Sequence, residues 1–546
     1  MSPGLDHDWQ SVFATPKPNV GERTKTRLLV VLCGLWVVFG LVGHMPWKPD
    51  ELQSISIIKH LLSGGDWLIP MMAGEATVKN PPLYYLSAAL SAKLFSPLLA
   101  MHDAARLVTG AWMTLTLLFV GMAGRELWGK GAGRQATLIF ISSIGIVFSA
   151  HMISPEVAGL TAYAMAFYGL TLAPRRPLRA GLILGFGVGI GFFAKGLLNL
   201  EVMLTMALML PLLSNHWRRP SYAQTLGIML IVATPWIAPW LILLHQKSPD
   251  LFHTWLTDSR AIANHTGYVV KGLVWYAWPA LPLALWTLWS MRPNHSSVQI
   301  SLLFFLVQFA ILGTGISNND VYLLPFLLPL TALATPAIDK LQRSYASALS
   351  WFGVMLFGSL AVLVWTGWVA MTMGVPTKLA GRAHILSSSY VPHFNFIATA
   401  LAIALTLLWA AVVFKSHRSN RAAVTDWAVG MTMAWGLVMT LWLPWLDAAK
   451  SYQPVFKSMQ KAFPAQFGCI TGRDIGPSQR AAIDYYINQK VQRFELVQNL
   501  RACDLYLIQD ERDRDKIDPG SDWKLIWKGK RPSDRHESFR LFQHVD

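Results

Sequence analysis

Stretches of about twenty predominantly apolar residues alternate with short polar segments up to residue 445 of the chain. A helix of about 20 such residues is long enough to cross the hydrocarbon core of a bilayer. We therefore expect an α-helical integral membrane protein with about thirteen transmembrane helices. The predicted spans lie near 28–46, 104–127, 135–151, 156–173, 180–195, 197–213, 222–244, 271–290, 298–316, 321–337, 348–373, 393–414 and 424–445.

Two stretches within residues 47–103 have a different pattern. In "ELQSISIIKHLLSGG", apolar Leu52, Ile55 and Ile58 recur at helical spacing beside polar residues. Such an amphipathic helix lies in the membrane interface rather than crossing the bilayer. The second stretch, "LYYLSAALSAKLF", is more apolar, but counting it as a span would invert every later loop. We interpret residues 47–103 as a long first outer loop with two interfacial helices.

The pattern changes again after Trp445. "QRAAIDYYINQK" predicts a helix, whereas "RFELVQ", "DLYLIQD", "DWKLIWKG" and "SFRLFQHV" predict strands. This region contains no phosphate loop, metal-ligand spacing or nucleophile elbow. The predicted organisation is a tail at 1–27, a transmembrane domain at 28–445 and a small soluble α/β accessory domain at 446–546.

The charged residues predict the orientation of these spans. Only 14% of the 546 residues are charged, whereas soluble proteins carry about a quarter. The net charge of +16 comes largely from short basic clusters between apolar runs rather than from one basic face, which argues against a nucleic-acid partner. The clusters are "RELWGKGAGR", "APRRPLRAG", "NHWRRPS", "SMRPNH", "DKLQR" and "FKSHRSNR". With a cytoplasmic N-terminus, thirteen crossings place every cluster in the cytoplasm, as the positive-inside rule requires. We expect a bacterial inner-membrane protein whose C-terminal domain is periplasmic.

The three cysteines are too few for a disulfide framework. Cys33 falls in the first apolar run and is typical of a small packing residue. Cys469 and Cys503 both lie in the C-terminal region, where an oxidising compartment permits a disulfide. The sequence leaves both outcomes open, a bonded pair and two free thiols.

Adjacent carboxylates stand directly after the first apolar run, in "WKPDELQ". Near a membrane surface, Asp50 and Glu51 can orient or deprotonate an acceptor or bind a metal, but a solvated turn is an equally good interpretation of these two residues alone. The rest of the loop, with "SGGDWLIP" and "KNPPLYY", favours a functional site. Lys79 is notable there because positive charge is otherwise scarce on the predicted outer side.

These outer-loop motifs resemble the first extracytoplasmic loop of GT-C glycosyltransferases. The pattern is most similar to that of the lipid A aminoarabinose transferases and, more distantly, to that of protein O-mannosyltransferases. The similarity continues in "GFGVGIGFFAKGLLNL", "TPWIAPWLILLHQKSPDLF" and "ISNNDVYLLPFLLPL", and it covers about residues 28–340. It implies a membrane enzyme that moves a sugar from a polyprenyl-phosphate carrier onto an acceptor outside the cytoplasm.

The resemblance also implies catalytic positions. Asp50 corresponds to the carboxylate proposed as catalytic in these enzymes, and Glu51 is its neighbour. Glu156, in "HMISPEVAGL", lies near a second outer-loop acid that is usually Asp in the family. A single displacement at the anomeric carbon, with inversion, is the reaction that this arrangement predicts.

Four further residues correspond to positions proposed to hold the donor phosphate: Lys79, Lys195, Arg260 and Tyr322. Cations placed against a departing phosphate stabilise its growing charge more strongly in a low-dielectric cleft than in water. Each residue also has a structural interpretation. Lys79 can be a solvated lysine and Lys195 a snorkelling one, Arg260 can pair with Asp258, and Tyr322 can be an interfacial aromatic.

Two departures from the family pattern concern the donor sugar. The chain has "VKNPP" where aminoarabinose transferases have Glu-Lys-Pro, and "SNND" replaces a Lys-containing stretch. The first change removes an acid beside Lys79, and the second removes a positive charge and adds Asp320. A sugar other than aminoarabinose, or a different acceptor, is the better prediction.

The predicted function is thus a glycosyltransferase that modifies lipid A or another lipid, glycan or protein acceptor of the cell envelope. Its partners would be the polyprenyl-linked donor, that acceptor and membrane lipids. No metal ligand set is predicted, although the carboxylates leave a divalent metal open as a cofactor. The rival interpretations are a transporter or flippase for the same lipids and a non-catalytic scaffold. A transporter would favour inverted repeats and broken helices around a midplane site, and the sequence has no clear repeat.

Overall fold

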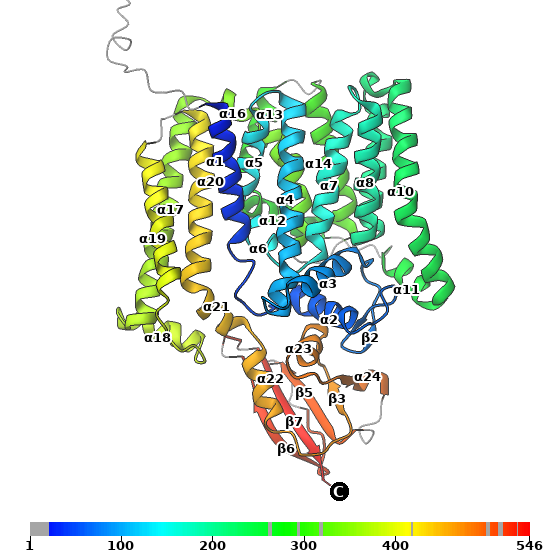
Figure 1. The fold of residues 1–546 in the computed structure, drawn as a ribbon, viewed down its shortest axis with the longest axis vertical. Helices are drawn as coiled ribbons and strands as arrows, with labels where there is room; N and C mark the ends of the chain where they lie inside the picture. Colours follow the sequence, from blue (N-terminus) through cyan, green and yellow to red (C-terminus); the bar gives the residue numbers. More distant parts are fainter. Residues whose placement is uncertain are drawn as a thin grey trace, which may run out of the picture.

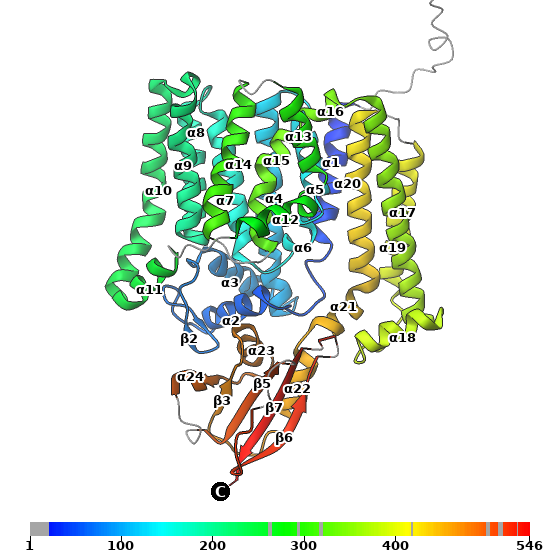
Figure 2. The ribbon, with the colours of Figure 1, turned by 180° about the vertical axis from the view of Figure 1, so that it is seen from behind.

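The computed structural model describes residues 21–259, 265–291, 295–315, 320–415, 419–497, 503–511, 517–531, 533–534 and 536–545. Helices run side by side in one thick layer, and the first loop and the C-terminal region lie together at one end of it (Figure 1 and, from behind, Figure 2). The helices of the layer are α1 (Glu22–Val38), α4 (Met101–Trp128), α5 (Ala132–Ser142), α6 (Ile146–Ser149), α7 (Pro155–Leu172), α8 (Pro177–Lys195), α9 (Leu197–Leu213), α10 (Pro220–Lys247), α12 (Thr266–Tyr276), α13 (Ala280–Ser290), α14 (Ser296–Gly315), α15 (Leu327–Ala334), α16 (Ala337–Lys340), α17 (Arg343–Met373), α19 (Phe396–Lys415), α20 (Asn420–Leu437) and α21 (Leu443–Lys450). Short 3₁₀ turns, η1 (Asn215–Trp217) and η2 (Asp320–Phe326), and a π-helical segment, η3 (Val438–Trp442), join some of them.

The layer is that of a multi-spanning membrane protein. Within the described residues, seven helical stretches are long and apolar enough to cross a bilayer, and an eighth results if α12 and α13, which meet at 98°, form one broken span. Every one of the thirteen predicted stretches contains helix. Several are short or interrupted, as at α5–α6 and η2–α15, so the count of thirteen remains a prediction.

Glycines let α8 pack closely against two neighbours at once. Added Cβ atoms at Gly181 and Gly185 would lie 2.7 Å from side-chain carbons of α10. One at Gly187, on the other side, would lie 2.8 Å from the Ala166 backbone nitrogen of α7. The glycine-rich run therefore serves helix packing, as small residues commonly do in membranes.

The first loop folds across the end of the layer. It contains α2 (Asp50–Leu62), a two-stranded ribbon of β1 (Met71–Met72) and β2 (Glu75–Ala76), and α3 (Leu83–Phe95). Both predicted amphipathic helices are thus present. α2 does not lie with a free polar face, because it packs against α3 on one side and against the C-terminal helix α23 (Pro477–Ile487) on another. Two further helices flank this end of the layer, α11 (Pro249–Ser259) and α18 (Thr377–Leu386) (Figure 1).

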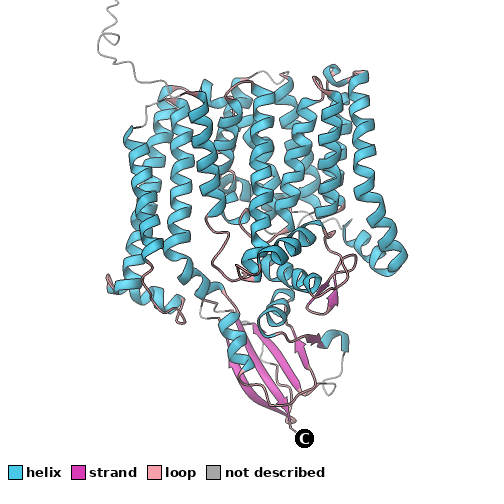
Figure 3. Ribbon diagram, in the orientation of Figure 1, coloured by secondary structure: helices cyan, strands magenta, loops and turns pink. Residues whose placement is uncertain are grey.

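The C-terminal region forms a five-stranded mixed sheet (Figure 3). Its strands are β3 (Ile470–Arg473), β4 (Val491–Arg493), β5 (Leu505–Glu511), β6 (Trp523–Gly529) and β7 (Glu537–His544), in the order β4-β3-β5-β7-β6. β3 pairs in parallel with β4 and β5, whereas β7 is antiparallel to β5 and β6. α22 (Gln453–Gln460) and α23 bury Phe456 and Ile483 with Leu505 and Leu541 of the sheet.

The strand prediction is right for β5, β6 and β7 but wrong for most of "RFELVQ". Only its first residue, Arg493, belongs to a strand, as the last residue of β4, and Phe494–Val497 forms the short helix α24. β3 was not predicted, because its sequence has no alternation of apolar and polar residues. It is a four-residue strand inside the sheet and is buried along most of its length. Such strands are too short for a clear sequence period.

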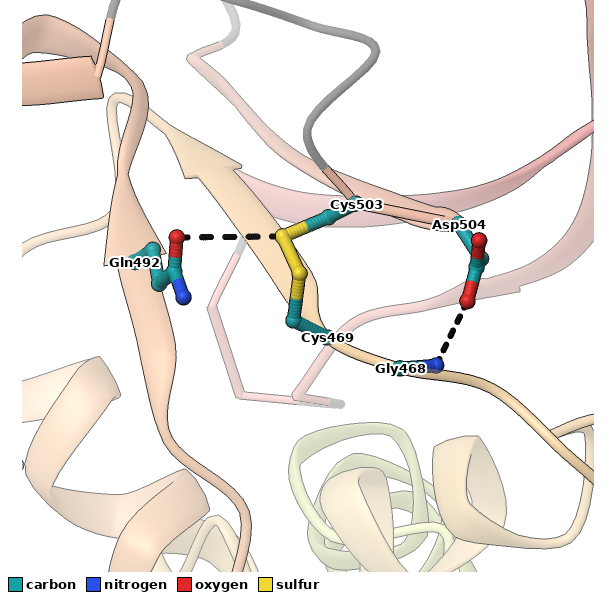
Figure 4. The surroundings of a disulfide bond; sticks show 5 residues. All are labelled: Gly468, Cys469, Gln492, Cys503 and Asp504. Atoms are coloured by element: carbon teal, nitrogen blue, oxygen red, sulfur yellow. Dashed lines mark hydrogen bonds between the residues drawn. A yellow bond between two sulfur atoms is a disulfide. The ribbon is translucent and has the colours of Figure 1, made fainter.

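A disulfide joins Cys469, which directly precedes β3, to Cys503, which lies two residues before β5, with the Cα atoms 4.8 Å apart (Figure 4). Beside it, the Gly468 backbone N–H donates a 2.5 Å hydrogen bond to the Asp504 carboxylate. Gln492 Oε1 lies 3.8 Å from the sulfur of Cys503. Of the two outcomes left open by the sequence, the structure contains the bonded pair.

Candidate functional site

A cavity of about 520 Å³ opens where the first loop meets α11 and the adjoining ends of α7, α8 and α9. This volume is typical of sites for small ligands, which range over roughly 300–1,000 Å³. Four of the residues predicted from the sequence line it: Lys79, Glu156, Lys195 and Tyr322. They come from the first loop, α7, α8 and η2, so the fold brings together positions that are far apart in the chain.

Lys195 lies at the centre of the contacts in this cavity. Its Nζ forms an ion pair with Glu156 and donates a 3.0 Å hydrogen bond to Asn80 Oδ1. The same ammonium lies 5.4 Å from the centre of the Tyr322 ring, within range of a cation–π interaction. Lys195 therefore links the first loop, α7 and η2.

Local sequence explains how the pair is positioned. Ser154 caps α7, with its hydroxyl accepting from the Glu156 backbone N–H at 3.4 Å, and Pro155 occupies the first turn. Glu156 thus sits at the positive end of the helix dipole. Gly159, one turn further on, leaves the space that Lys195 fills, because a Cβ there would lie 2.8 Å from Lys195 Cγ.

Lys79 occupies the loop side of the cavity and is exposed. Among the described residues it has no ion-pair partner, unlike Lys195. On α11, Asp258 lines the cavity as a second carboxylate. An incoming anion would therefore meet one cation that is already neutralised by Glu156 and one that is not.

Asp50 is the first residue of α2 and does not line the cavity itself. Tyr85, on α3, accepts a 3.4 Å hydrogen bond from Asn80 Nδ2 of the cavity lining. Burial raises the pKa of Tyr85 to about 12, and the negative charges of Glu156 and Asp50 act in the same direction. Asp50 is half-buried, and the α2 N-terminus favours its charge.

Glu51 is enclosed rather than open to the cavity. It is fully buried, and Oε1 accepts from Arg106 Nε at 3.0 Å and from the Ile153 backbone N–H at 3.0 Å. Oε2 accepts from the Trp47 backbone N–H at 2.9 Å. Burial by itself would raise the pKa of Glu51, but the charge of Arg106 and these hydrogen bonds hold it below its ordinary value of 4.5. These contacts give Glu51 a positioning role at the base of α2.

The C-terminal region holds α2 from the other side. Ser56 Oγ donates to Asp484 at 2.8 Å, and Lys59 pairs with the same carboxylate at 2.9 Å. Ser478 Oγ donates to the Pro49 carbonyl at 3.2 Å, directly beside Asp50. The helix that carries the predicted catalytic carboxylate is thus fixed by α23.

Two further proposals made from the sequence, a phosphate-binding Arg260 and a divalent metal, are not part of these contacts. Arg260 lies outside the described residues, although its neighbour Ser259 lines the cavity. Within the described ranges, no three His, Cys, Asp or Glu side chains come close enough to hold a metal ion.

Sequence reasoning missed three residues that this geometry makes important: Asn80, Tyr85 and Arg106. Asn80 and Tyr85 lie within the quoted loop motif but have no charge to draw attention. Arg106 did carry a signal, because a lone arginine near the start of an apolar span implies a buried partner. That partner is Glu51, 55 positions away.

The fold is that of a multi-spanning membrane protein, and it is similar to the folds of solved transferases. Crystal structures of ArnT from Cupriavidus metallidurans, in the apo state and bound to undecaprenyl phosphate, superpose with TM-scores of 0.68 and 0.66 at 14% and 13% sequence identity. In both cases 95% of this chain and 98% of that chain are covered. The GT-C resemblance predicted from the sequence is confirmed at the level of the fold.

Sequence comparison gives the particular relatives. Residues 79–242 match the family described as dolichyl-phosphate-mannose-protein mannosyltransferase. The undecaprenyl phosphate-alpha-4-amino-4-deoxy-L-arabinose arabinosyl transferase of Yersinia enterocolitica is 26% identical over 445 residues, which is 76% of each chain. The protein of the same name from Pseudomonas aeruginosa is 25% identical and covers 77% of this chain and 76% of its own length. The chain is similar to these transferases along most of its length.

Proposed function

We propose that this protein is a glycosyltransferase that moves a monosaccharide from a polyprenyl-phosphate carrier to a lipid, glycan or protein acceptor. The reaction would take place on the periplasmic side of a bacterial inner membrane. The observation that carries the proposal is the cavity at the loop end of the helices, lined by Lys79, Lys195 and Tyr322. The relatives named for transfer from undecaprenyl phosphate support the same reaction class.

The proposed chemistry is one displacement. An acceptor oxygen attacks the anomeric carbon, the bond from that carbon to the phosphate oxygen breaks, and the phosphate leaves with the electron pair. Lys79 and Lys195 stabilise the charge that grows on the phosphate, and the partly enclosed cavity strengthens this interaction. Asp50 orients the acceptor and takes its proton; if the acceptor is a phosphate, only orientation is needed.

The other acids have supporting roles in this proposal. Glu156 neutralises Lys195 before the donor enters and fixes the position of its ammonium. Glu51 anchors the first turn of α2, which carries Asp50, through Arg106. Arg260 is proposed as a further phosphate ligand on the basis of the sequence resemblance alone.

The test combines binding and transfer. Purified wild-type protein and variants are titrated with undecaprenyl phosphate, and envelope lipids and glycans from cells expressing each form are analysed by mass spectrometry. We expect Asp50→Asn to bind the carrier normally but to lose transfer by about 10²- to 10⁴-fold, as for loss of a general base. We expect Lys79→Ala to weaken carrier binding, since it removes the cation without a described ion-pair partner.

Lys93→Ala is the matched control, because Lys93 is an exposed lysine of the same loop that does not line the cavity. It should bind and transfer like the wild type. Equal carrier binding by wild type and Lys79→Ala would contradict the phosphate role. An envelope glycome unchanged by removal of the protein would favour the transporter or scaffold instead.

A further inference from the structure

The cavity has two chemically different halves. Next to the loop stand the charged residues Lys79, Glu156 and Lys195. Deeper along α7 and α9, the lining is mostly apolar, with two polar side chains, Tyr163 and Asn199. Asn199 lies in the first turn of α9, separated from Lys195 by the break at Gly196, and Tyr163 lies one turn beyond Gly159 in α7. No step of the proposed displacement uses this deeper half.

Both polar side chains in the deeper half lack a hydrogen-bonding partner among the described residues. Asn199 is 4% exposed and Tyr163 is 1% exposed, and neither Asn199 Nδ2 nor the Tyr163 hydroxyl is paired. A third lining residue, Trp255 of α11, has an unpaired indole N–H and is 2% exposed. Unpaired buried donors are uncommon in folded proteins, because each one has lost its hydrogen bonds to water without replacing them. These three line one cavity, where they can donate to a ligand with oxygen acceptors.

The charges of the neighbourhood indicate what kind of ligand this is. The three unpaired groups are neutral, and the adjacent Glu156 is already paired with Lys195. An ammonium group on a ligand would be desolvated here beside the Lys195 ammonium, and the other carboxylate of the lining, Asp258 on α11, is exposed rather than buried next to the unpaired donors. A hydroxyl oxygen, in contrast, accepts from an amide, an indole or a phenol without such a cost.

We propose that Asn199, Tyr163 and Trp255 form the sugar subsite of this cavity and select an uncharged, hydroxyl-bearing monosaccharide over an amino sugar. The proposal rests on the proposed function, because the sugar is taken to enter on a polyprenyl phosphate held by Lys79 and Lys195. It assigns a donor class that differs from the amino sugar named for the relatives. The specificity lies in the deeper half and the phosphate binding in the loop half.

The experiment measures the affinity of the full-length protein for undecaprenyl phosphate alone and for two matched pairs of sugar-linked carriers. One pair carries L-arabinose or 4-amino-4-deoxy-L-arabinose, and the other carries D-glucose or D-glucosamine. For the wild type we expect at least one hydroxyl sugar to bind about tenfold or more tightly than the plain carrier, and its amino counterpart to bind more weakly. One satisfied buried hydrogen bond accounts for a factor of roughly 5 to 100.

Tyr163→Phe and Asn199→Leu remove one hydrogen-bonding group each and keep most of the volume. Each variant should lose most of the gain from the sugar and keep the wild-type affinity for the plain carrier, which also shows that it is folded. Asn199→Asp, which adds a negative charge, should shift the preference toward the amino member of each pair. Tyr222→Phe is the control, because the Tyr222 hydroxyl already donates to the Ala207 carbonyl at 2.6 Å and does not line the cavity.

The outcomes separate this inference from the function on which it rests. Failure of the wild type to bind any of the five lipids would overturn the proposed function. Binding of all five with equal affinity, or tighter binding of the amino sugars, would overturn the sugar subsite and leave the phosphate site standing. Retention of the full hydroxyl preference in both Tyr163→Phe and Asn199→Leu would show that these residues hold water only, and would also overturn the subsite.

Discussion

At the scale of single residues, the buried pair of Glu51 and Arg106 does more for the site than its position suggests. Both side chains are fully buried, and Arg106 also donates to Asp103 at 2.8 Å and to the carbonyl oxygens of Leu41 and His44. The pair therefore joins the end of α1, the start of α2 and the start of α4. Removing one partner from such a pair leaves an uncompensated charge in the interior, at a typical cost of about 3–5 kcal/mol.

We predict that Glu51→Gln strongly lowers thermal stability at neutral pH and that the wild type approaches the variant in acid. The pKa of Glu51 is held below 4.5 in the folded protein, so its charge stabilises the fold at all pH values above about 4.5. The stabilisation is lost as the pH falls below that value and the carboxylate is protonated. Melting curves in detergent between pH 3 and 7, on the order of four pH units, would measure the effect.

Glu22→Gln is the control for that comparison, since Glu22 forms exposed ion pairs with Lys25 and Arg134. Exposed pairs contribute little to stability, so this variant should melt like the wild type at every pH. A Glu51→Gln protein as stable as the wild type at pH 7 would contradict the role given to the buried pair.

At the scale of elements, the position of the site depends on how closely α8 approaches α7 and α10. The glycines of α8 leave no room for a methyl group on either side. Because α8 ends at Lys195 and α7 begins at Pro155, the separation of these helices decides whether Lys195 reaches Glu156. Packing along the helices is thus coupled to the geometry of the cavity at their ends.

We predict that Gly187→Ala destabilises the protein and weakens binding of undecaprenyl phosphate. Its Cβ would lie 2.8 Å from a backbone nitrogen of α7, so the helices must separate, and such overpacking costs about 1–3 kcal/mol. Gly227→Ala is the matched control in α10, because nothing lies within 4 Å of its added Cβ. The control should melt at the same temperature or higher, since alanine favours a helix by roughly 0.5–1 kcal/mol. Equal melting temperatures for the two variants would contradict this account of the packing.

The elements also show which parts of the structure a sequence can predict. Apolar runs located the helices well, because the bilayer demands a simple composition over a fixed length. The prolines in 321–337 indicated the interruption at η2, but the apolar runs did not predict the 98° bend between α12 and α13 or the interruption at α6, because these depend on tertiary packing rather than on composition. For the same reason, the amphipathic pattern predicted an interfacial helix at α2 but not the contacts of its polar residues Ser56 and Lys59 with α23.

The site divides in a similar way. Lys79, Glu156, Lys195 and Tyr322 were predicted from charge, position and family resemblance, and they line one cavity. Glu156 and Lys195 are 39 positions apart in the chain, and Glu51 and Arg106 are 55 positions apart. Local sequence patterns therefore do not predict either ion pair. The neutral residues of the deeper half were missed for the same reason, because an asparagine or a tyrosine in an apolar helix resembles ordinary packing until a cavity is seen beside it.

At the scale of the whole molecule, the charge distribution and the arrangement of the elements both distinguish the two ends of the helical layer. The first loop, the cavity and the C-terminal sheet lie at one end of the helical layer, and the start of α1 lies at the other (Figures 1 and 2). Arg134 pairs with Glu22 at the start of α1, and Arg421 pairs with Asp339 beside α16. The described basic clusters at the ends of α4, α7 and α19 therefore gather on the side away from the cavity.

We predict that this basic end is cytoplasmic, so that reporters inserted after Lys415 and after Lys450 lie on opposite sides of the membrane. Lys415 ends α19 at the basic end, and Lys450 ends α21 at the end that carries the sheet. Basic loops are retained in the cytoplasm, and the Cys469–Cys503 disulfide is of the kind that forms in an oxidising compartment. Alkaline phosphatase should be active only after Lys450, and a cytoplasmic fluorescent reporter only after Lys415. If both reporters lay on the same side, α20–α21 would not cross the bilayer, and the site proposed for the periplasmic face would lose its orientation.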